Sequence, residues 1–161
     1  CFMKIISEKC HLRVLDFLSD SNIREWHSFL KDSASFSEND IAEYQEKRLN
    51  DILKHANDNT DFYKNQLSSL KIDLNEKIKI YQLSDLPILN REKVRNNYDK
   101  LLSSNYKNFK PIYRSTGGTT GTPLNYIYDK NSWSLGWALK IRDWSYGNYR
   151  IGEKMAFSVK K

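Results

Sequence analysis

Ser115-Thr116-Gly117-Gly118-Thr119-Thr120-Gly121-Thr122-Pro123 is the stretch on which the interpretation of this sequence depends. It holds three glycines and five hydroxyl residues in nine positions. Glycine lets the backbone turn sharply and approach a ligand closely, and successive backbone N–H groups can form an anion-binding nest. Serine and threonine hydroxyls can also donate to phosphate oxygens. The stretch therefore predicts a loop that binds a polyphosphate.

The spacing of the glycines excludes two common nucleotide-binding loops. The Walker loop needs Gly-Lys-Ser or Gly-Lys-Thr after its glycines, and the dinucleotide loop needs the pattern G-x-G-x-x-G. Here the glycines lie at 117, 118 and 121. Both of those loops also lead into a helix, whereas the alternation over 124–128 predicts a strand. The alternative without a ligand is a surface turn between two strands.

The longer string 113–124 reads Tyr-Arg-Ser-Thr-Gly-Gly-Thr-Thr-Gly-Thr-Pro-Leu. It resembles the phosphate loop of the adenylate-forming superfamily, in particular the branch of phenylacetate–CoA ligases and CapK-like capsular polysaccharide biosynthesis proteins. Residues 48–56 with 62–63, and residues 85–95, resemble two further segments of that branch. Asp61 stands where the branch usually has proline, and Arg91 where lysine is common. The resemblance covers roughly residues 37–159.

The resemblance implies an ATP-dependent ligase that activates a carboxylic acid. The carboxylate attacks the α-phosphate of ATP, which gives an acyl-adenylate and pyrophosphate, and a thiol or another nucleophile then takes the acyl group. ATP and Mg²⁺ are the implied cofactors, with CoA as a further one, and Mg²⁺ would share the charge of the leaving pyrophosphate. The implied phosphate contacts are Ser115, Thr116, Gly117, Gly118, Thr119, Thr120, Gly121 and Thr122.

Other motifs that the superfamily uses are not found in these 161 residues. They are an aromatic-Gly-x-Thr-Glu motif, a ribose-binding aspartate, a hinge and a lysine of a small C-terminal domain. No catalytic residue and no metal ligand is therefore predicted. We expect the chain to be an N-terminal fragment that is inactive alone. The alternative is a non-catalytic polysaccharide-biosynthesis protein that keeps the fold without the chemistry. Leu124 replaces the lysine that many members carry after the proline.

The order of expected elements predicts a helical N-terminal region, residues 1–110, followed by the start of an α/β nucleotide-binding domain, residues 111–161. Because this domain is expected to be truncated, the chain itself is predicted to be α+β. Strands are expected at 112–115, 124–128 and 155–159, and irregular backbone at 71–89 and 103–111. Gly147 suits a helix end, and Gly152 a turn. Five residues are predicted helix N-caps: Asn22, Ser37, Thr60, Asn90 and Asn131.

Charge and composition limit the choice of partners. The net charge is +6 and the pI about 9.2, but the basic residues alternate with acids and apolar residues. A solvated surface is favoured, and a nucleic-acid binder is the weakest of the three hypotheses. Two cysteines make neither a disulfide framework nor a zinc site. No apolar run is long enough to cross a membrane, so we expect a cytoplasmic protein without membrane insertion. The oligomeric state is left open.

Several other side chains have structural explanations. The three histidines, His11, His27 and His55, are too scattered in sequence to indicate a metal site or a catalytic triad. Trp133, Trp137, Ile141 and Trp144 recur at helical intervals, which is typical of a core stripe. Arg114, just before the loop, could attract phosphate or be an ordinary surface residue. The remaining charges considered are predicted to lie on the surface: Glu92, Arg95, Arg142 and Asp143.

Overall fold

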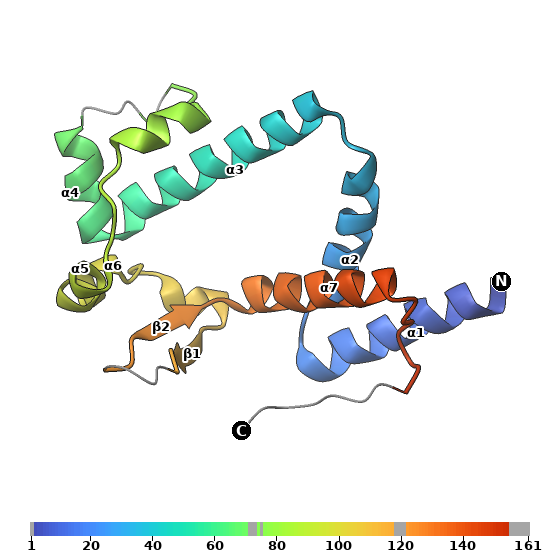
Figure 1. The fold of residues 1–161 in the computed structure, drawn as a ribbon. Helices are drawn as coiled ribbons and strands as arrows, with labels where there is room; N and C mark the ends of the chain where they lie inside the picture. The colour runs from blue at the N-terminus through green and yellow to red at the C-terminus, as the bar shows by residue number, and fades with distance from the viewer. Residues whose placement is uncertain (1, 71–73, 75, 118–121, 155–161) are drawn as a thin grey trace. The chain divides into compact units, whose positions relative to one another are not determined.

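A computed structural model describes residues 2–70, 74, 76–117 and 122–154. The described chain is mostly helical with one small antiparallel sheet, an α+β arrangement. Figure 1 shows its elements, which follow the chain in this order: α1 (Phe2–Ser19), α2 (Ile23–Asp32), η1 (Ser33–Ser35), α3 (Glu38–Asn59), α4 (Asp61–Ser69), η2 (Ile80–Asp85), α5 (Arg91–Asn96), α6 (Tyr98–Leu101), η3 (Tyr106–Phe109), β1 (Ile112–Ser115), β2 (Asn125–Tyr128) and α7 (Lys130–Tyr146).

The chain forms two compact units. The first unit combines Cys1–Ser35 with Tyr128–Lys161, and the second is Phe36–Ile127. The units divide at 35/36 and 127/128, because α7 packs against α2 from the start of the chain. The predicted division into regions 1–110 and 111–161 stays a prediction. Whether residues 111–161 open a nucleotide-binding domain stays a prediction, and the expected strand 155–159 lies outside the described residues.

The first unit is built from α1, α2 and α7. Its core consists of five buried residues, and Trp26, Trp133 and Trp144 pack against them. The expected stripe on α7 is largely a core stripe: Ile141 is buried, whereas Trp137 remains 36% exposed. The five buried core residues are Leu12, Ile23, Leu30, Ala138 and Ile141.

The side-chain cap predicted at Asn22, at the start of α2, is not formed. Asn22 is the N-cap residue, but its side chain makes no capping bond. The carboxylate of Asp16, at the end of α1, accepts instead from the backbone N–H groups of Ile23 at 2.7 Å and Arg24 at 3.1 Å. The turn between α1 and α2 brings this carboxylate to the free donors, so the Asn22 side chain is not needed there.

The start of α7 corrects a second cap. The helix begins at Lys130, and its N-cap is Asp129, whose side chain accepts from Ser132 N–H. Asn131, predicted as the cap, lies in the first turn. Its Oδ1 accepts from Asn22 Nδ2 at 2.7 Å and from Trp26 Nε1 at 2.8 Å. One amide oxygen thus joins α7 to two residues of the α2 segment.

Replacing Asp16 by alanine should lower the free energy of unfolding by about 0.5–2 kcal/mol, because two N–H groups of the first turn of α2 lose their acceptor. Urea unfolding followed by tryptophan fluorescence measures the loss. Asp32→Ala, at the other end of α2, is the matched control and should stay within about 0.5 kcal/mol of the original chain. Equal unfolding midpoints for the two variants would contradict the capping role of Asp16.

The second unit begins with α3 and α4, which pack against each other. The three caps predicted for this part of the chain are confirmed. Ser37 forms a capping box with Asp40, Thr60 accepts from Tyr63 N–H, and Asn90 accepts from Lys93 N–H. The hydrogen bond from the Ser37 side chain holds the pKa of Asp40 below its ordinary value. Each cap satisfies donors that the helix itself cannot.

The core of the second unit is formed by Leu53, Leu67 and Ile78. Asn50 on α3 holds the segment around Ile78 through both backbone groups of that residue. Its Oδ1 accepts from Ile78 N–H at 2.8 Å, and its Nδ2 donates to Ile78 C=O at 2.9 Å. Nearby, Glu46 forms ion pairs with Lys79 at 3.0 Å and Lys77 at 3.2 Å, which lower the pKa of Glu46.

The segments predicted as irregular contain short 3₁₀ helices. Among the described residues, η2 lies within 71–89 and η3 within 103–111. Bonds from Gln82 N–H to Lys79 C=O and from Asn108 N–H to Asn105 C=O, both 3.0 Å, span three residues. Such short turns have no sequence periodicity that distinguishes them from a loop.

The turns around the end of α7 agree in part with prediction. Gly147 is the C-cap, as expected, but its φ of −86° is one that any residue adopts. The left-handed position belongs to the next residue, Asn148, with φ of 62°. Gly152 lies in the predicted turn with φ of 95°, and an added Cβ there would lie 2.9 Å from the His11 imidazole. Gly152 thus allows the close approach of His11.

Candidate functional site

The candidate loop leaves from a short hairpin. β1 ends at Ser115 and β2 begins at Asn125, and the two strands are neighbours in one sheet. Two hydrogen bonds close the base of the loop: Thr116 N–H donates to Leu124 C=O at 2.9 Å, and Leu124 N–H donates to Thr116 Oγ1 at 3.0 Å. The Thr116 side chain therefore helps to close the hairpin, and the predicted strand–loop–strand order is confirmed.

The structure describes half of the predicted phosphate contacts. Ser115, Gly117 and Thr122 are exposed, and Thr116 is half-buried. A Cβ added to Gly117 would meet no atom of the described residues within 4 Å, so the backbone there faces open space. The other four predicted contacts lie outside the described residues: Gly118, Thr119, Thr120 and Gly121.

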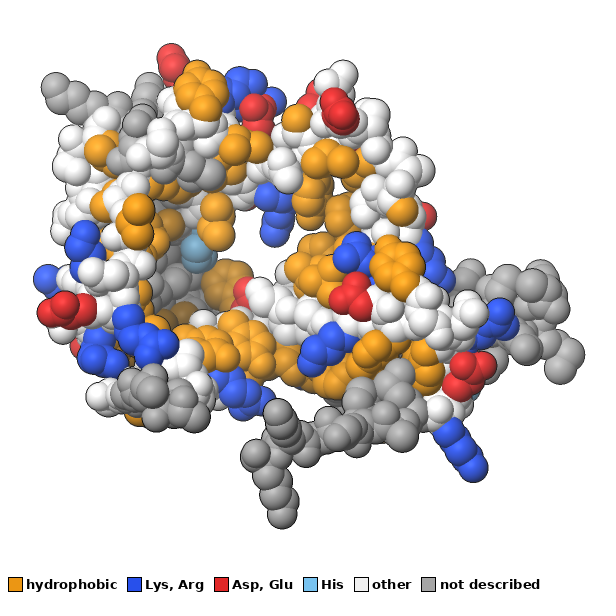
Figure 2. All heavy atoms as spheres, in the orientation of Figure 1, with side chains coloured by type: hydrophobic (Ala, Val, Ile, Leu, Met, Phe, Trp, Pro, Cys, Tyr) orange, Lys and Arg blue, Asp and Glu red, His pale blue; other side chains and the backbone are white. Residues whose placement is uncertain are grey.

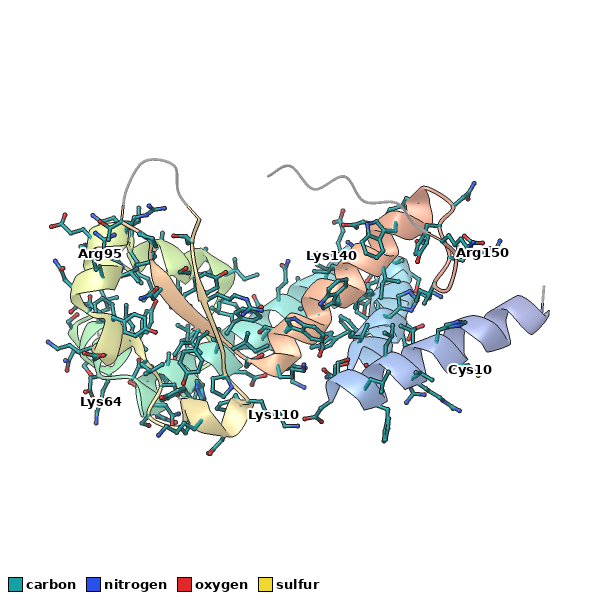
Figure 3. All side chains as sticks on the ribbon, turned by 90° about the horizontal axis from the view of Figure 1, so that it is seen from below. Cys10, Lys64, Arg95, Lys110, Lys140 and Arg150 are labelled. Atoms are coloured by element: carbon teal, nitrogen blue, oxygen red, sulfur yellow. The ribbon has the colours of Figure 1, made fainter. Side chains whose placement is uncertain are left out.

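Arg95 reaches the loop from α5. Its Nη2 donates to the carbonyl oxygen of Thr122 at 3.0 Å, which fixes the backbone where the loop returns to the sheet. Figure 3 labels Arg95 beside the end of the hairpin from which the loop departs. Arg95 is exposed, as predicted for a surface charge, but its contact was missed. The sequence around Arg95 has no pattern that predicts a contact with Thr122, which lies 27 positions further along the chain.

α5 gives this side of the second unit an excess of positive charge. The helix carries three basic residues, Arg91, Lys93 and Arg95, and one acid, Glu92. Figure 2 shows Lys and Arg side chains gathered over the region where α5 lies. Arg114 on β1 is exposed, and its Nη1 donates to the carbonyl oxygen of Tyr113. Of the charges on α5, the one on Arg95 contacts the loop itself, and positive charge beside a loop rich in hydroxyls and glycines suits an anionic ligand.

Three tyrosines link β1 to the preceding elements. A hydrogen bond with Tyr106 of η3 raises the pKa of Tyr113 on β1, and partial burial and the nearby phenol of Tyr98 on α6 act in the same direction. Because its pKa is raised from an already high value, the Tyr113 phenol stays neutral at physiological pH. The three tyrosines help to position the strand that leads into the loop.

A serine–histidine pair in the second unit resembles a catalytic dyad, but its hydrogen bonds do not suit catalysis. His55 Nε2 lies 3.2 Å from Ser103 Oγ. The Ser103 hydroxyl, however, donates to Asn105 Oδ1 at 2.6 Å, so its proton does not point to the imidazole as nucleophilic activation requires. The His55 ring also contacts Phe109 edge-to-face at 5.6 Å. These contacts give His55 a packing role in the second unit.

No group of three or more His, Cys, Asp or Glu side chains in the described part of the chain could hold a metal ion. Cys10 is an exposed free thiol on α1, and His27 is buried on α2. Within residues 2–70, 74, 76–117 and 122–154, no helix is both long and apolar enough to cross a membrane.

No protein-family model matches the chain, and no curated protein matches it significantly.

Proposed function

We propose that this chain forms the ATP-phosphate-binding part of an acyl-adenylate-forming ligase, an enzyme that activates carboxylic acids. The observation that carries the proposal is the hairpin at 112–128, with its base closed by Thr116 and Leu124. The exposed Ser115 is the last residue of β1, and the open space at Gly117 lies two residues further along the chain. A loop held at its base, with small residues where the backbone is open, leaves room for phosphate oxygens.

In this proposal the loop acts on the leaving group. The carboxylate of the substrate attacks the α-phosphorus of ATP, the bond to the bridging oxygen breaks, and pyrophosphate leaves. Backbone N–H groups after β1 and the Ser115 hydroxyl would bind the β- and γ-phosphates and stabilise the charge that develops on them. Mg²⁺ would be held through phosphate oxygens and would share that charge. CoA, as the acyl acceptor, belongs to the second half of such a reaction.

The chain should bind ATP and inorganic tripolyphosphate, and Gly117→Val should weaken both by about tenfold or more, which is ~1.4 kcal/mol. The valine side chain would fill the space proposed for phosphate. It should not disturb folding, because a Cβ at Gly117 meets no described atom within 4 Å. Isothermal titration with ATP in the presence of Mg²⁺ measures the affinity.

Gly136→Val is the matched control, since an added Cβ at Gly136 on α7 also meets no described atom within 4 Å. It should bind ATP as the original chain does. ATP binding that is absent from the original chain, or unchanged by Gly117→Val, would count against the proposed site. Exchange of labelled pyrophosphate into ATP, measured on a protein that joins this chain to the superfamily motifs that its 161 residues lack, separates a ligase from a protein that binds ATP without the chemistry. Aryl, acyl and aminoacyl carboxylic acids are the substrates to test.

A further inference from the structure

We propose that Arg95 is the positioning residue of this loop: it fixes the loop exit through the Thr122 carbonyl and places a permanent positive charge beside the phosphates. The proposal rests on the proposed function. The observation behind it is the 3.0 Å hydrogen bond from Arg95 Nη2 to Thr122 C=O, which joins two residues that are 27 positions apart.

The loop exit is held from two directions. On the sheet side, the reciprocal bonds between Thr116 and Leu124 fix the residues where the strands meet. On the helix side, Arg95 holds Thr122, two residues before Leu124. Without Arg95, the exit would lose the second of these two restraints. A binding loop loses less conformational entropy on ligand binding when its ends are already fixed.

The anchor itself sits on a well-defined element. α5 is capped by Asn90, whose Oδ1 accepts from Lys93 N–H at 2.8 Å. α5 also packs against α6. The guanidinium of Arg95 is therefore attached to an ordered helix and not to another part of the loop. A group that positions a ligand site needs such a rigid support.

Arginine adds something that a neutral anchor could not. A guanidinium has five N–H donors and stays charged at any physiological pH. The bond to Thr122 uses one nitrogen, Nη2, and the charge is already adjacent to the loop when an anion arrives. Hydrogen bonds from a cationic donor to an anion are stronger than bonds between neutral partners. The residue therefore suits a ligand with several negative charges and has little effect on a neutral ligand.

Three substitutions separate the anchoring role from the charge. Arg95→Lys keeps the charge and one donor group, Arg95→Gln keeps a neutral donor, and Arg95→Met keeps neither. Lys93→Met is the matched control, because it removes one positive charge from the same helix two residues away, a spacing that places the side chain on a different face. Lys93 and Arg95 are both exposed.

The affinities of the 161-residue chain for ATP, tripolyphosphate and AMP are measured by isothermal titration. Arg95→Met should weaken binding of ATP and tripolyphosphate by about tenfold, which is ~1.4 kcal/mol, and Arg95→Gln, which keeps a donor but no charge, should weaken it by a smaller factor. Their affinity for AMP should change much less. Arg95→Lys should recover part of the loss, and Lys93→Met should bind ATP within about twofold of the original chain, or ~0.4 kcal/mol.

Each other outcome decides against the inference. If Arg95→Met binds ATP normally while Gly117→Val does not, the role of Arg95 is wrong and the phosphate site stands. If Arg95→Met weakens AMP as much as ATP, Arg95 has only a general structural role. Should Arg95→Met fail to fold, normal ATP binding by Arg95→Gln overturns the inference. If the original chain binds neither ATP nor tripolyphosphate, the proposed function and the inference fall together.

Discussion

Replacing Leu12 by alanine is expected to lower the free energy of unfolding of the first unit by about 2–5 kcal/mol. Leu12 is 2% exposed and belongs to the core cluster with Ile23 and Leu30 of α2 and Ala138 and Ile141 of α7. Truncation removes apolar surface from this cluster and leaves a cavity that the surrounding helices fill only in part. Because Leu12 is the residue of α1 in this buried cluster, the change should also weaken the packing of α1 against α2.

The measurement is urea unfolding followed by tryptophan fluorescence. All four tryptophans, Trp26, Trp133, Trp137 and Trp144, belong to the first unit, so this signal reports on that unit. Leu18→Ala is the matched control: it is the same change on the same helix, at a side chain that is 75% exposed. It should shift the stability by about 0.5 kcal/mol or less. If the two variants unfold at the same urea concentration, α1 is not packed as described.

The second large effect is expected for Leu67→Ala in the second unit, with a loss of about 2–5 kcal/mol. Leu67 on α4 is 1% exposed and packs in one cluster with Leu53 of α3 and with Ile78. Its removal weakens the contact between α3 and α4 and the segment that Asn50 binds. Tyr63, whose pKa burial raises, packs against the same cluster.

Far-UV circular dichroism during urea unfolding measures this change, because the second unit contains no tryptophan. Ile52→Ala is the matched control: Ile52 precedes Leu53 on α3 and is 63% exposed. It should cost much less than Leu67→Ala. The tryptophan fluorescence transition gives a second comparison, since it follows the other unit. A Leu67→Ala variant as stable as Ile52→Ala would contradict the assigned core of the second unit.

Local signals in the sequence were sufficient for several elements. Ser37, Thr60 and Asn90 are caps because their side chains bond to backbone groups three residues further on, a contact that sequence spacing alone specifies. The hairpin strands on both sides of the glycine-rich stretch were likewise predictable from alternation and turn residues. Such interactions are short in range and need no knowledge of the rest of the fold.

Long-range contacts were not predictable from those signals. Asn22 and Asn131 have good capping chemistry, yet they bond to each other across the first unit, because Asp16 and Asp129 satisfy the helix starts instead. The Ser103 hydroxyl turns to Asn105 rather than to His55. In each case several partners compete for one polar group, and geometry selects between them.

Residue types and their spacing were enough to predict capped helices followed by a hairpin whose connecting loop is dense in glycine and hydroxyl residues. The folded chain was needed to see that α7 belongs with the start of the chain and that Arg95 holds the loop exit at Thr122. The difference lies in the range of the forces involved. Capping and alternation act between residues near in sequence, whereas burial and a guanidinium's hydrogen bond depend on which distant segments the folded chain brings together.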